Sequence, residues 1–329
     1  MTYWSGKRVL VTGGAGFIGS HLVERLVALG AQVTVPLRSA DAPREHLAGV
    51  LDRIALPVAD LSRWEEALRV ATGQDVVMNL AAQVGGVQYN IDHPASIFRE
   101  NLTIFMNVIE AARVAAVGRF LVVSSACVYP RDSTVPTPEE EGFAGIPEPT
   151  NEGYGWAKRM EEFLGAAYAR QYGMSVAIAR PYNAYGPRDN FAPDRSHVIP
   201  ALIRRVCSGE NPLRVWGTGE QTRTFLYASD FADGLLAVAE RYPKADPVNL
   251  GSTEEVTVRD LARLILELSG VRVTVEFDAS RPVGQPRRAC DTRKAERVLG
   301  FQAAVPLREG LARTIEWYRT RAMSLRPQS

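Results

Sequence analysis

Tyr154 and Lys158 are the two residues whose types and spacing most directly indicate chemistry. They stand four positions apart in Tyr154-Gly-Trp-Ala-Lys158, which places a phenol and an ammonium on one face of a helix. A neighbouring ammonium favours the phenolate, so the tyrosine can pass a proton to or from a substrate oxygen near neutral pH. Many such pairs are only surface neighbours. Here a predicted strand ends in Val122-Val-Ser-Ser125 and brings the Ser125 hydroxyl to the same cleft.

A glycine-rich turn near the N-terminus predicts a dinucleotide site. Gly13, Gly16 and Gly19 follow an apolar strand, and a helical pattern opens at Phe17–Ile18. Gly13 makes the tight turn, Gly16 lets the backbone approach a pyrophosphate, and Gly19 lets the helix pack closely on the strand. A glycine turn can be purely structural. Its place between a strand and an amphipathic helix favours dinucleotide binding.

The end of the second predicted strand bears on which dinucleotide is bound. In NAD enzymes an acidic residue there binds the ribose hydroxyls. Here the strand ends in Leu37-Arg38-Ser39 with no acid before Asp41, and Arg38 could instead pair with a 2′-phosphate. We therefore expect NADP; the alternative is NAD, with Arg38 merely solvated. Asp60-Leu61, after the third strand, is placed to contact the adenine edge, unless Asp60 is a helix N-cap.

The helices and strands that position these residues can be predicted from the first 180 residues. In this part of the chain, short β-rich runs alternate with longer helical patterns. That alternation is typical of a parallel sheet with crossover helices. The predicted strands are Arg8–Val11, Gln32–Val35, Ile54–Val58, Asp75–Asn79, Phe120–Ser124 and Ser175–Ala179, and the predicted helices are Phe17–Leu29, Arg63–Ala71, Ala95–Ala115 and Tyr154–Tyr172. The sequence thus predicts an α/β fold, a Rossmann doubly wound parallel sheet, with residues 1–180 as an NAD(P)-binding domain.

Residues 181–329 are less regular and predict a smaller C-terminal α/β substrate-binding subdomain. Its expected strands are Leu213–Trp216, Arg223–Tyr227, Pro247–Leu250 and Val273–Phe277, and its expected helices are Ile199–Cys207, Phe231–Arg241, Val258–Leu268 and Leu307–Arg319. We expect this subdomain to close over the carboxyl edge of the sheet, where open α/β sheets bind ligands. Segments of the chain could pass between the two domains.

Composition argues against several other classes of protein. The net charge is +1, from 38 basic and 37 acidic residues, so neither a nucleic acid nor a membrane partner is expected and an anionic ligand needs a local cluster. No apolar run approaches membrane-spanning length, and the early strand leaves no room for a signal peptide. Cys127, Cys207 and Cys290 lie far apart, which predicts neither disulfides nor a metal site and makes a cytoplasmic location the expected one.

The glycine loop, Ser125 and the Tyr-x-x-x-Lys pair make the chain resemble the extended short-chain dehydrogenase/reductase superfamily of nucleotide-sugar epimerases, dehydratases and reductases. The resemblance covers nearly the whole length and includes Leu80-Ala81-Ala82-Gln83 and Glu100-Asn101. It implies that Ser125, Tyr154 and Lys158 form the catalytic triad, with Lys158 also touching the nicotinamide ribose. It also places Ala81 and Ala82 at the cofactor, and Asn101 in support of the active-site helix.

Cys127 and His197 narrow this resemblance to the GDP-L-fucose synthases, 3,5-epimerase/4-reductases of GDP-4-keto-6-deoxymannose. The matching stretches are Ser124-Ser-Ala-Cys-Val-Tyr-Pro130 and Ser196-His-Val-Ile-Pro200, and in that family the matching cysteine and histidine serve as base and acid. Inversion beside a ketone needs a base on one face and an acid on the other, and both side chains titrate near enough to neutrality to exchange these roles. Taken singly, the cysteine could be a small buried hydrophobe and the histidine a hydrogen-bonding loop residue.

The same resemblance implies a set of substrate-binding residues, which are Asn183, Arg205, Trp216, Arg223 and Arg288. Arg205 and Arg223 would bind the diphosphate, because a guanidinium fork suits phosphate oxygens. Asn183 and Trp216 would contact sugar or nucleotide, and Arg288 would lie near the base or the phosphates. The alternatives are a surface charge for Arg288 and core packing for Trp216.

Two departures from the GDP-L-fucose synthases keep an alternative function open. The Gly13–Gly16 loop lacks an arginine that the reductases often carry, and the stretch from Trp216 to Arg223 is closer to GDP-mannose 3,5-epimerases. We expect a GDP-sugar 3,5-epimerase/4-ketoreductase that uses NADPH; the alternative is a redox-neutral NAD-dependent nucleotide-sugar epimerase of the GDP-mannose 3,5-epimerase or 4-epimerase type. Ala126-Cys127 replaces the acids typical of 4,6-dehydratases, and the intact triad argues against a non-catalytic sensor.

The family resemblance also implies a homodimer. Its expected interface is formed by the helices Ala95–Ala115 and Tyr154–Tyr172, whose outer faces are apolar enough to pair.

Overall fold

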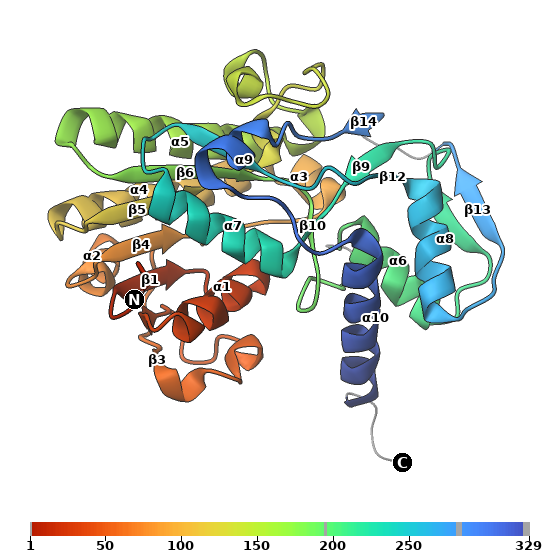
Figure 1. Cartoon of the computed structure of the whole chain (residues 1–329), viewed down its shortest axis with the longest axis horizontal. Coiled ribbons are helices and arrows are strands. Elements are labelled where there is room, and N and C mark those ends of the chain that lie inside the picture. The colour runs from red at the N-terminus through yellow and green to blue at the C-terminus, as the bar shows by residue number, and fades with distance from the viewer. Residues whose placement is uncertain (1, 194–195, 281–284, 325–329) are drawn as a thin grey trace.

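A seven-stranded parallel sheet forms the centre of the protein (Figure 1). The structure, a computed structural model, describes residues 2–193, 196–280 and 285–324. The strand order is β11-β6-β5-β4-β1-β2-β3, and every neighbouring pair is parallel. The strands are β1 (Arg8–Thr12), β2 (Gln32–Thr34), β3 (Ile54–Ala55), β4 (Val76–Asn79), β5 (Arg119–Val123), β6 (Val176–Pro181) and β11 (Pro247–Leu250).

The sheet is covered by helices on both faces, which explains why its strands are almost continuously apolar. Along β1, Val9 and Val11 pack into one hydrophobic core, whereas Leu10 packs into the other, as alternating side chains of a strand must. The helices α1 (Phe17–Ala28), α7 (Ala228–Arg241) and α9 (Arg293–Leu299) contribute to the first core. The helices α2 (Trp64–Ala71), α4 (Pro94–Val114) and α5 (Glu152–Tyr172) contribute to the second. The predicted doubly wound α/β fold is therefore confirmed.

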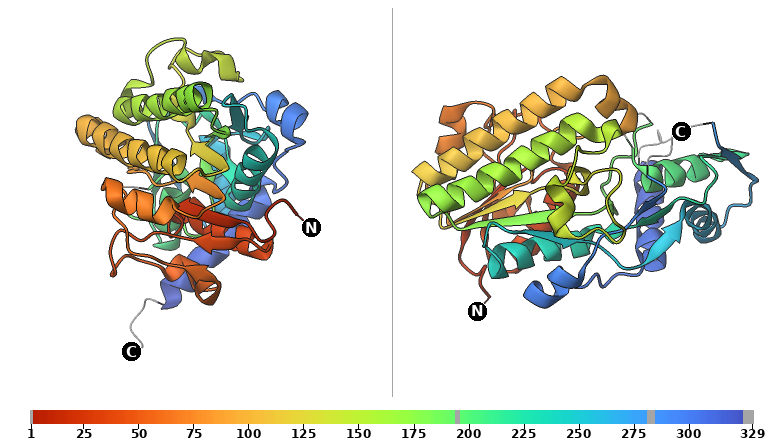
Figure 2. Two further views of the ribbon diagram at one scale, coloured as in Figure 1. Left: turned by 90° about the vertical axis from the view of Figure 1, so that its left-hand side faces the viewer. Right: turned by 90° about the horizontal axis from the view of Figure 1, so that it is seen from above.

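A smaller part with its own core lies beside the carboxyl ends of the central strands (Figures 1 and 2). It contains the helices α6 (Val198–Cys207), α8 (Val258–Ser269) and α10 (Leu307–Ser324) and the parallel pair β8 (Leu213–Trp216) and β13 (Val275–Asp278). A three-stranded sheet of β12 (Glu255–Thr257), β9 (Thr222–Thr224) and β14 (Arg287–Arg288) and a pair formed by β7 (Ala184–Tyr185) and β10 (Leu226–Tyr227) connect it to the large sheet. Together they provide the second wall of a cleft.

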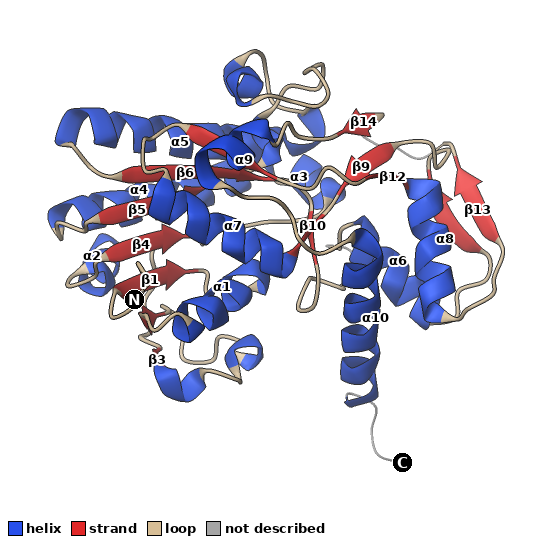
Figure 3. Cartoon of the chain, in the orientation of Figure 1, coloured by secondary structure: helices blue, strands red, loops and turns tan. Residues whose placement is uncertain are grey.

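The structure corrects two details of the predicted organisation (Figure 3). The predicted strand Arg223–Tyr227 is two short strands, β9 and β10, which pair with different partners. Pro247–Leu250, which we expected in the smaller subdomain, is the edge strand β11 beside β6, and α7 packs on the same sheet. Val248 and Leu250 are fully buried, and such short apolar strands fit a sheet that is covered on both faces. Segments after residue 180 thus complete the large sheet.

Several short elements carry no periodic pattern and were not predicted. They are the helices α3 (Val87–Asp92) and α9, the strands β7, β12 and β14, and the 3-10 turns η1 (Glu45–Leu47), η2 (Leu51–Arg53), η3 (Ala126–Val128), η4 (Glu139–Phe143) and η5 (Pro149–Asn151). In the part of the chain that the structure describes, no helix is long and apolar enough to cross a bilayer, and no group of three or more potential metal ligands comes together.

Candidate active site

A cavity of about 2370 Å³ runs between the carboxyl ends of the central strands and the smaller part of the protein. All of the predicted cofactor-binding residues line it, namely Gly13, Gly16, Phe17, Ile18, Gly19, Arg38, Asp60, Leu61, Ala81 and Ala82. So do all the predicted catalytic and substrate-binding residues, namely Ser125, Cys127, Tyr154, Lys158, Asn183, His197, Arg205, Trp216, Arg223 and Arg288. Residues from sequence segments up to about 275 positions apart therefore share one space, as the distance from Gly13 to Arg288 shows.

The glycine loop is packed so tightly that side chains are excluded. Gly13 has φ +67°, and a Cβ on it would lie 2.9 Å from the amide nitrogen of Ala81. A Cβ on Gly19 would lie 2.1 Å from the carbonyl oxygen of Gly13, which brings α1 directly against the turn. The first residues of α1, Phe17 to Gly19, line the cavity, so the positive end of the helix faces it. No side chain caps this end and its first turn contains no acid. This cradle fits the diphosphate of a dinucleotide.

Thr12 fixes the loop that follows β4 on the other side of this cradle. Its hydroxyl donates to the Asn79 side chain at 2.7 Å and accepts from the amides of Leu80 at 3.1 Å and Ala81 at 3.0 Å. Two adjacent parallel strands are thereby tied together at the point where they enter the cavity. The three glycines and Thr12 thus fix the backbone on both sides of the cradle.

Arg38 and Asp60 lie at the adenine end of the predicted cofactor site. Arg38 is exposed, and its charge helps to lower the pKa of Asp60, after the larger effect of hydrogen bonds from Ser62. The amide and hydroxyl of Ser62 donate to Asp60 Oδ1 at 3.0 and 2.8 Å. The N-cap of α2 is Arg63, which has no side-chain cap, so the alternative reading of Asp60 as a helix cap is wrong.

Ser125 and Tyr154 meet where β5 ends and α5 begins. Ser125 caps η3 by accepting from the Cys127 amide at 3.1 Å. Burial raises the pKa of Tyr154 to about 12, and the charge of Lys158 and a hydrogen bond with Ser125 only partly oppose that effect. Lys158 thus acts on Tyr154 in the predicted direction, but burial outweighs it. Burial therefore favours the protonated phenol, and Lys158 favours the phenolate.

Lys158 is fully enclosed, and the sequence analysis missed its main partner. Its Nζ lies 5.6 Å from the centre of the Tyr154 ring, 3.0 Å from the carbonyl oxygen of Val123 and 2.9 Å from Glu161 Oε2. Burial raises the pKa of Glu161 to about 7, against the opposing attraction of Lys158. The i, i+3 spacing of a lysine and a glutamate was the sequence signal that could have revealed this pair.

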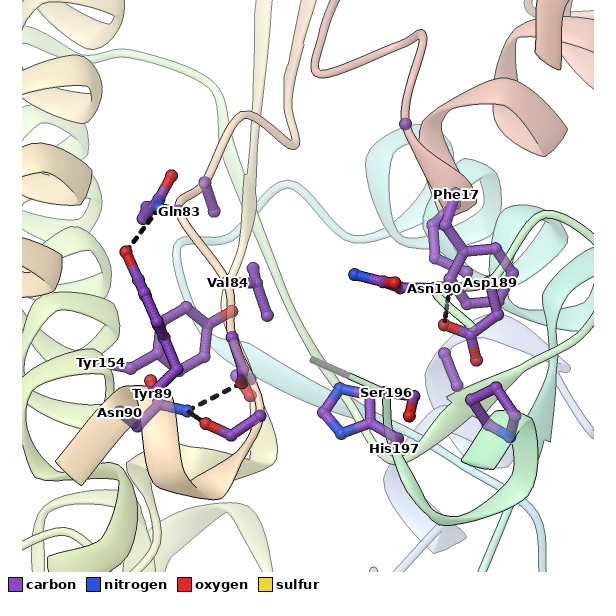
Figure 4. Close-up of a pocket in the computed structure, with 18 of the residues that line it drawn as sticks. Phe17, Gln83, Val84, Tyr89, Asn90, Tyr154, Asp189, Asn190, Ser196 and His197 are labelled. Atoms are coloured by element: carbon purple, nitrogen blue, oxygen red, sulfur yellow. Dashed lines mark hydrogen bonds between the residues drawn. The ribbon is translucent and has the colours of Figure 1, made fainter. Parts of the chain in front are cut away.

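Cys127 and His197 both face Arg288. Arg288 Nη2 lies 3.8 Å from Cys127 Sγ, and the nearby thiol is one of the causes that raise the pKa of Arg288. His197 is the N-cap residue of α6; burial, followed by the charge of Arg288, lowers its pKa, so its imidazole is neutral at pH 7. Figure 4 shows His197 on the wall opposite Tyr154. The structure therefore brings together the thiol, the imidazole and the phenol that the sequence singled out.

The cations and aromatic side chain predicted for substrate binding differ in their surroundings. Burial, and next the charge of Arg288, lowers the pKa of Arg223 to about 10. Arg205 instead forms a bidentate ion pair with Glu210, with Nε 2.7 Å from Oε2. The Trp216 residue is 53% exposed at the cavity, so core packing is wrong as its explanation. Arg288 is part-buried inside the cavity, so the reading as a surface charge is wrong as well.

Three further polar residues belong to the cavity although no motif pointed to them. The Glu148 carboxylate is buried near Arg223 and Arg288. Burial raises the pKa of Asp189 to about 7, and this side chain lies with Phe17 and His197 on one side of the close-up in Figure 4. Asn90 donates to Asn151 at 3.1 Å and thereby connects α3 to the turn before α5.

Asn183 and Asn101 have structural contacts that the family resemblance did not specify. Asn183 Nδ2 donates to the carbonyl oxygen of Thr224 at 2.8 Å, which ties the segment between β6 and β7 to β9. Asn101 accepts from the Gln83 amide at 2.7 Å and donates to the Gln83 carbonyl oxygen at 3.1 Å. Asn101 therefore holds the loop after β4; the expected support of the active-site helix is not among its hydrogen bonds.

Comparison with known proteins assigns this arrangement to a family. The model of the "NAD dependent epimerase/dehydratase family" matches residues 9–251. The chain belongs to the NAD dependent epimerase/dehydratase family. This confirms the resemblance drawn from the glycine loop and the Ser125, Tyr154 and Lys158 set.

Curated relatives and solved structures extend this family assignment. The chain is 37% identical to probable GDP-L-fucose synthase 1 of Oryza sativa subsp. japonica over 95% of this chain and 92% of that protein. It is 34% identical to a dTDP-4-dehydro-6-deoxy-D-allose reductase of a Streptomyces species over 96% and 97%. The fold matches the UDP-glucose 4-epimerase of Thermotoga maritima with a TM-score of 0.86 and 29% identity, over 96% of this chain and 99% of that one. The family member described here is an NAD(P)-dependent enzyme of the nucleotide-sugar epimerase and reductase type.

Proposed function

We propose that the enzyme inverts carbons beside the ketone of a 4-keto nucleotide sugar, a GDP-sugar, and then reduces the ketone with NADPH. The observation that carries this proposal is the pair Cys127 and His197, which share the cavity with Tyr154 and both face Arg288. A 4-epimerase or a plain ketoreductase needs the phenol but has no use for a second acid/base pair. The combination supports a 3,5-epimerase/4-ketoreductase.

The epimerisation step needs a proton removed and a proton returned on opposite faces of the carbon next to the ketone. Neutral His197 and the Cys127 thiol are the groups that can exchange these protons. Arg288, 3.8 Å from the sulfur, stabilises the negative charge that forms when the thiol gives up its proton. Because its charge also faces His197, Arg288 favours the neutral form of the imidazole.

The reduction step needs a proton donor at the sugar oxygen. Bound NADPH would supply the hydride, held by the Gly13–Gly19 cradle and, at a 2′-phosphate, by Arg38. Tyr154 then protonates the alkoxide, and its protonated state at neutral pH suits this direction of transfer. Ser125, which hydrogen-bonds to Tyr154, polarises the same oxygen.

We assign the nucleotide end of the substrate to the part of the cavity that Arg205, Trp216 and Arg223 line. Arg223 and Arg205 would bind the diphosphate and the exposed Trp216 would stack on the sugar or the base. Among relatives that match more than nine-tenths of the chain, the rice protein is named for a GDP-sugar and the Streptomyces protein for a dTDP-sugar. We assign GDP, because Cys127 and His197 stand in the stretches that resemble the fucose synthases.

The direct test is incubation of the purified enzyme with NADPH and GDP-4-keto-6-deoxymannose. We expect a loss of absorbance at about 340 nm that is stoichiometric with substrate, together with solvent deuterium at the inverted carbons. A parallel reaction with dTDP-4-keto-6-deoxyglucose tests the nucleotide. Inversion without any loss of absorbance would instead establish the redox-neutral epimerase, and turnover of the dTDP substrate alone would overturn the GDP assignment.

We also propose that the enzyme is a homodimer joined through α4 and α5, which lie side by side (Figure 2). Met106 and Val114 on α4 and Phe163 and Tyr172 on α5 are all exposed apolar or aromatic residues, between 44% and 55% accessible. A second copy of the chain would cover such a face. Light scattering of the wild type should give twice the chain mass, and Phe163→Glu should give the monomer mass. A monomeric wild type at micromolar concentration would refute the dimer.

A further inference from the structure

Glu161 and Lys158 form an ion pair inside the catalytic helix. The side chains are 1% and 2% exposed, and Lys158 Nζ lies 2.9 Å from Glu161 Oε2. The remaining contact that fixes the ammonium is the Val123 carbonyl oxygen at 3.0 Å, at the end of β5. Two of the three ammonium donors are therefore directed away from the Tyr154 ring, whose centre is 5.6 Å distant.

We propose that Glu161 is a positioning residue for the ketone reduction: it anchors the Lys158 ammonium at the end of β5 and neutralises its charge, so that Tyr154 enters the reaction as a protonated phenol. This inference rests on the proposed function for the direction of proton transfer, from Tyr154 to the sugar oxygen. The pairing of Glu161 with Lys158 rests on the geometry alone. It assigns a role in the reaction to a residue that lines no part of the cavity.

The charges around Tyr154 explain how Glu161 acts. The groups with the largest effects on the pKa of Tyr154 are Lys158 and Glu161 on α5, the Cys127 thiol of η3 and the Ser125 hydroxyl. Around Glu161 itself the charged neighbours are Lys158 and Glu162. A lone buried ammonium would favour the phenolate, whereas an ammonium already paired with a carboxylate attracts the phenolate far less. With the pair intact, the phenol keeps its proton until the sugar oxygen takes it.

Glu162, the next residue, provides a matched comparison because it is equally buried and pairs elsewhere. Its Oε1 and Oε2 lie 2.7 and 2.6 Å from Arg180 Nε and Nη2 on β6, and its Oε1 also accepts from the Ser124 hydroxyl. Glu162 acts on Lys158 less strongly than Glu161 does, and it is not one of the largest influences on the pKa of Tyr154. The two adjacent glutamates therefore have different partners. Glu162 connects α5 to β6 through Arg180, and Glu161 pairs with the ammonium beside the phenol.

The decisive measurement is the titration of Tyr154 in the whole, cofactor-free chain. Tyrosines are replaced by 3-fluorotyrosine, and the fluorine resonance of Tyr154 is assigned by its loss in Tyr154→Phe. In Glu161→Gln we expect this resonance to titrate about 1–3 pH units below the wild type, the range produced by a nearby unpaired opposite charge. A Tyr154 titration that is unchanged in Glu161→Gln would overturn the assignment.

Two further variants separate this role from a general loss of stability. Glu162→Gln should lower the melting temperature, yet leave the Tyr154 titration close to the wild type; an equal shift in both variants would overturn the proposal. Glu161→Gln/Lys158→Met removes both charges and should return the Tyr154 titration to the wild-type value or above. A shift that persists in this double variant would show that the Lys158 charge is not its cause, and would also overturn the proposal.

Steady-state rates with NADPH and the 4-keto nucleotide sugar provide the functional readout. Reduction requires the protonated phenol, so the rate should fall at high pH, and Glu161→Gln should move that fall to lower pH by the same shift as the fluorine titration. Glu161→Asp, which keeps the carboxylate, should recover part of the difference. If no variant reduces the ketone, the proposed function fails, while the fluorine titration still decides the assignment of Glu161.

Discussion

The two walls of the cavity are built from different materials. The cofactor wall, Gly13–Gly19 with Arg38, is mainly backbone from one strand, one turn and the start of one helix. The substrate wall, formed by Cys127, His197, Arg223 and Arg288, is made of side chains from segments that are far apart in sequence; the Cys127–Arg288 contact alone spans 161 residues. Local geometry dominates the first wall, and tertiary packing and charge dominate the second.

We expect the largest effect on cofactor binding from a side chain added at Gly19, where the cofactor wall is most tightly packed. In Gly19→Ala the new Cβ would lie 2.1 Å from the Gly13 carbonyl oxygen, so either α1 or the turn must move. We expect loss of measurable NADPH binding by fluorescence titration and a lower melting temperature, since overpacking of this kind costs about 1–3 kcal/mol or more. Gly49→Ala is the control: its Cβ would meet only Glu24 Oε1 at 3.8 Å, so binding and melting should hardly change.

A large and selective effect is expected on the substrate wall from Cys127→Ser. The hydroxyl is a poor replacement for a thiol as a base, so deuterium exchange at the inverted carbons should fall by about 10²–10⁴-fold. NADPH binding should be retained, because Cys127 is not part of the cofactor wall. Cys207→Ser, at the end of α6, is the matched control. Exchange at the wild-type rate in Cys127→Ser would remove the thiol from the mechanism.

Arg223 and Arg205 should differ, although both were predicted to bind the diphosphate. Arg223→Ala should weaken the binding of GDP by about 10–100-fold, the range for a buried charged hydrogen bond. Arg205→Ala should have a smaller effect, because its guanidinium is already engaged by Glu210. Isothermal titration calorimetry with GDP compares the two variants. Equal losses would mean that Arg205 leaves Glu210 when the nucleotide binds.

Arg38 tests the exposed edge of the cofactor wall. Because this side chain is exposed, Arg38→Ala should reduce the preference for NADPH over NADH by only about 5-fold, as expected for a solvent-screened charge pair. The measurement is the ratio of kcat/KM for the two cofactors, which does not depend on the overall activity of the variant. An unchanged ratio would leave NAD as the better assignment.

The smallest effect concerns the response of stability to pH, to which two histidines contribute: His197 of the substrate wall and His21 on α1. Burial lowers the pKa values of His197 and of His21, whose Nε2 lies 2.9 Å from the Pro187 carbonyl oxygen. Unfolding lets each ring bind a proton, so the free energy of unfolding should fall as the pH drops below about 6.5 and level off above it. Urea unfolding at several pH values should show that this fall is smaller in His197→Gln than in the wild type. A steeper fall in the variant would contradict the neutral imidazole.

The sequence predicted the cofactor wall better than the substrate wall, because the cofactor wall consists of residues close together in the chain. The glycine spacing and the apolar strands specified the sheet and the cofactor cradle, because a turn, a strand and a helix start leave local signals. The helix α3 and the turns η1 to η5 were missed, since they are too short to show periodicity. The strand β11 was placed in the wrong part because its four residues carry no information about which sheet they join.

In the candidate site, too, some features could be predicted from local sequence and others could not. The types of Ser125, Cys127, Tyr154 and His197 predicted the chemistry that we propose, and all of them line the cavity. Their protonation was not readable, because burial opposes the attraction of Lys158 at Tyr154 and its magnitude depends on the whole fold. The engagement of Arg205 by Glu210 was equally invisible, although both residues lie within one short segment.

The sequence by itself determined the family and the Rossmann fold, and it singled out the candidate reactive groups, because these depend on local spacing and residue type. Only the tertiary structure decided that Arg288 lies beside Cys127, that Glu161 pairs with the Lys158 ammonium, and that burial raises the pKa of Tyr154. The physical reason is that charge and desolvation act through space. Their balance at any one group is fixed only once distant segments have been packed around it.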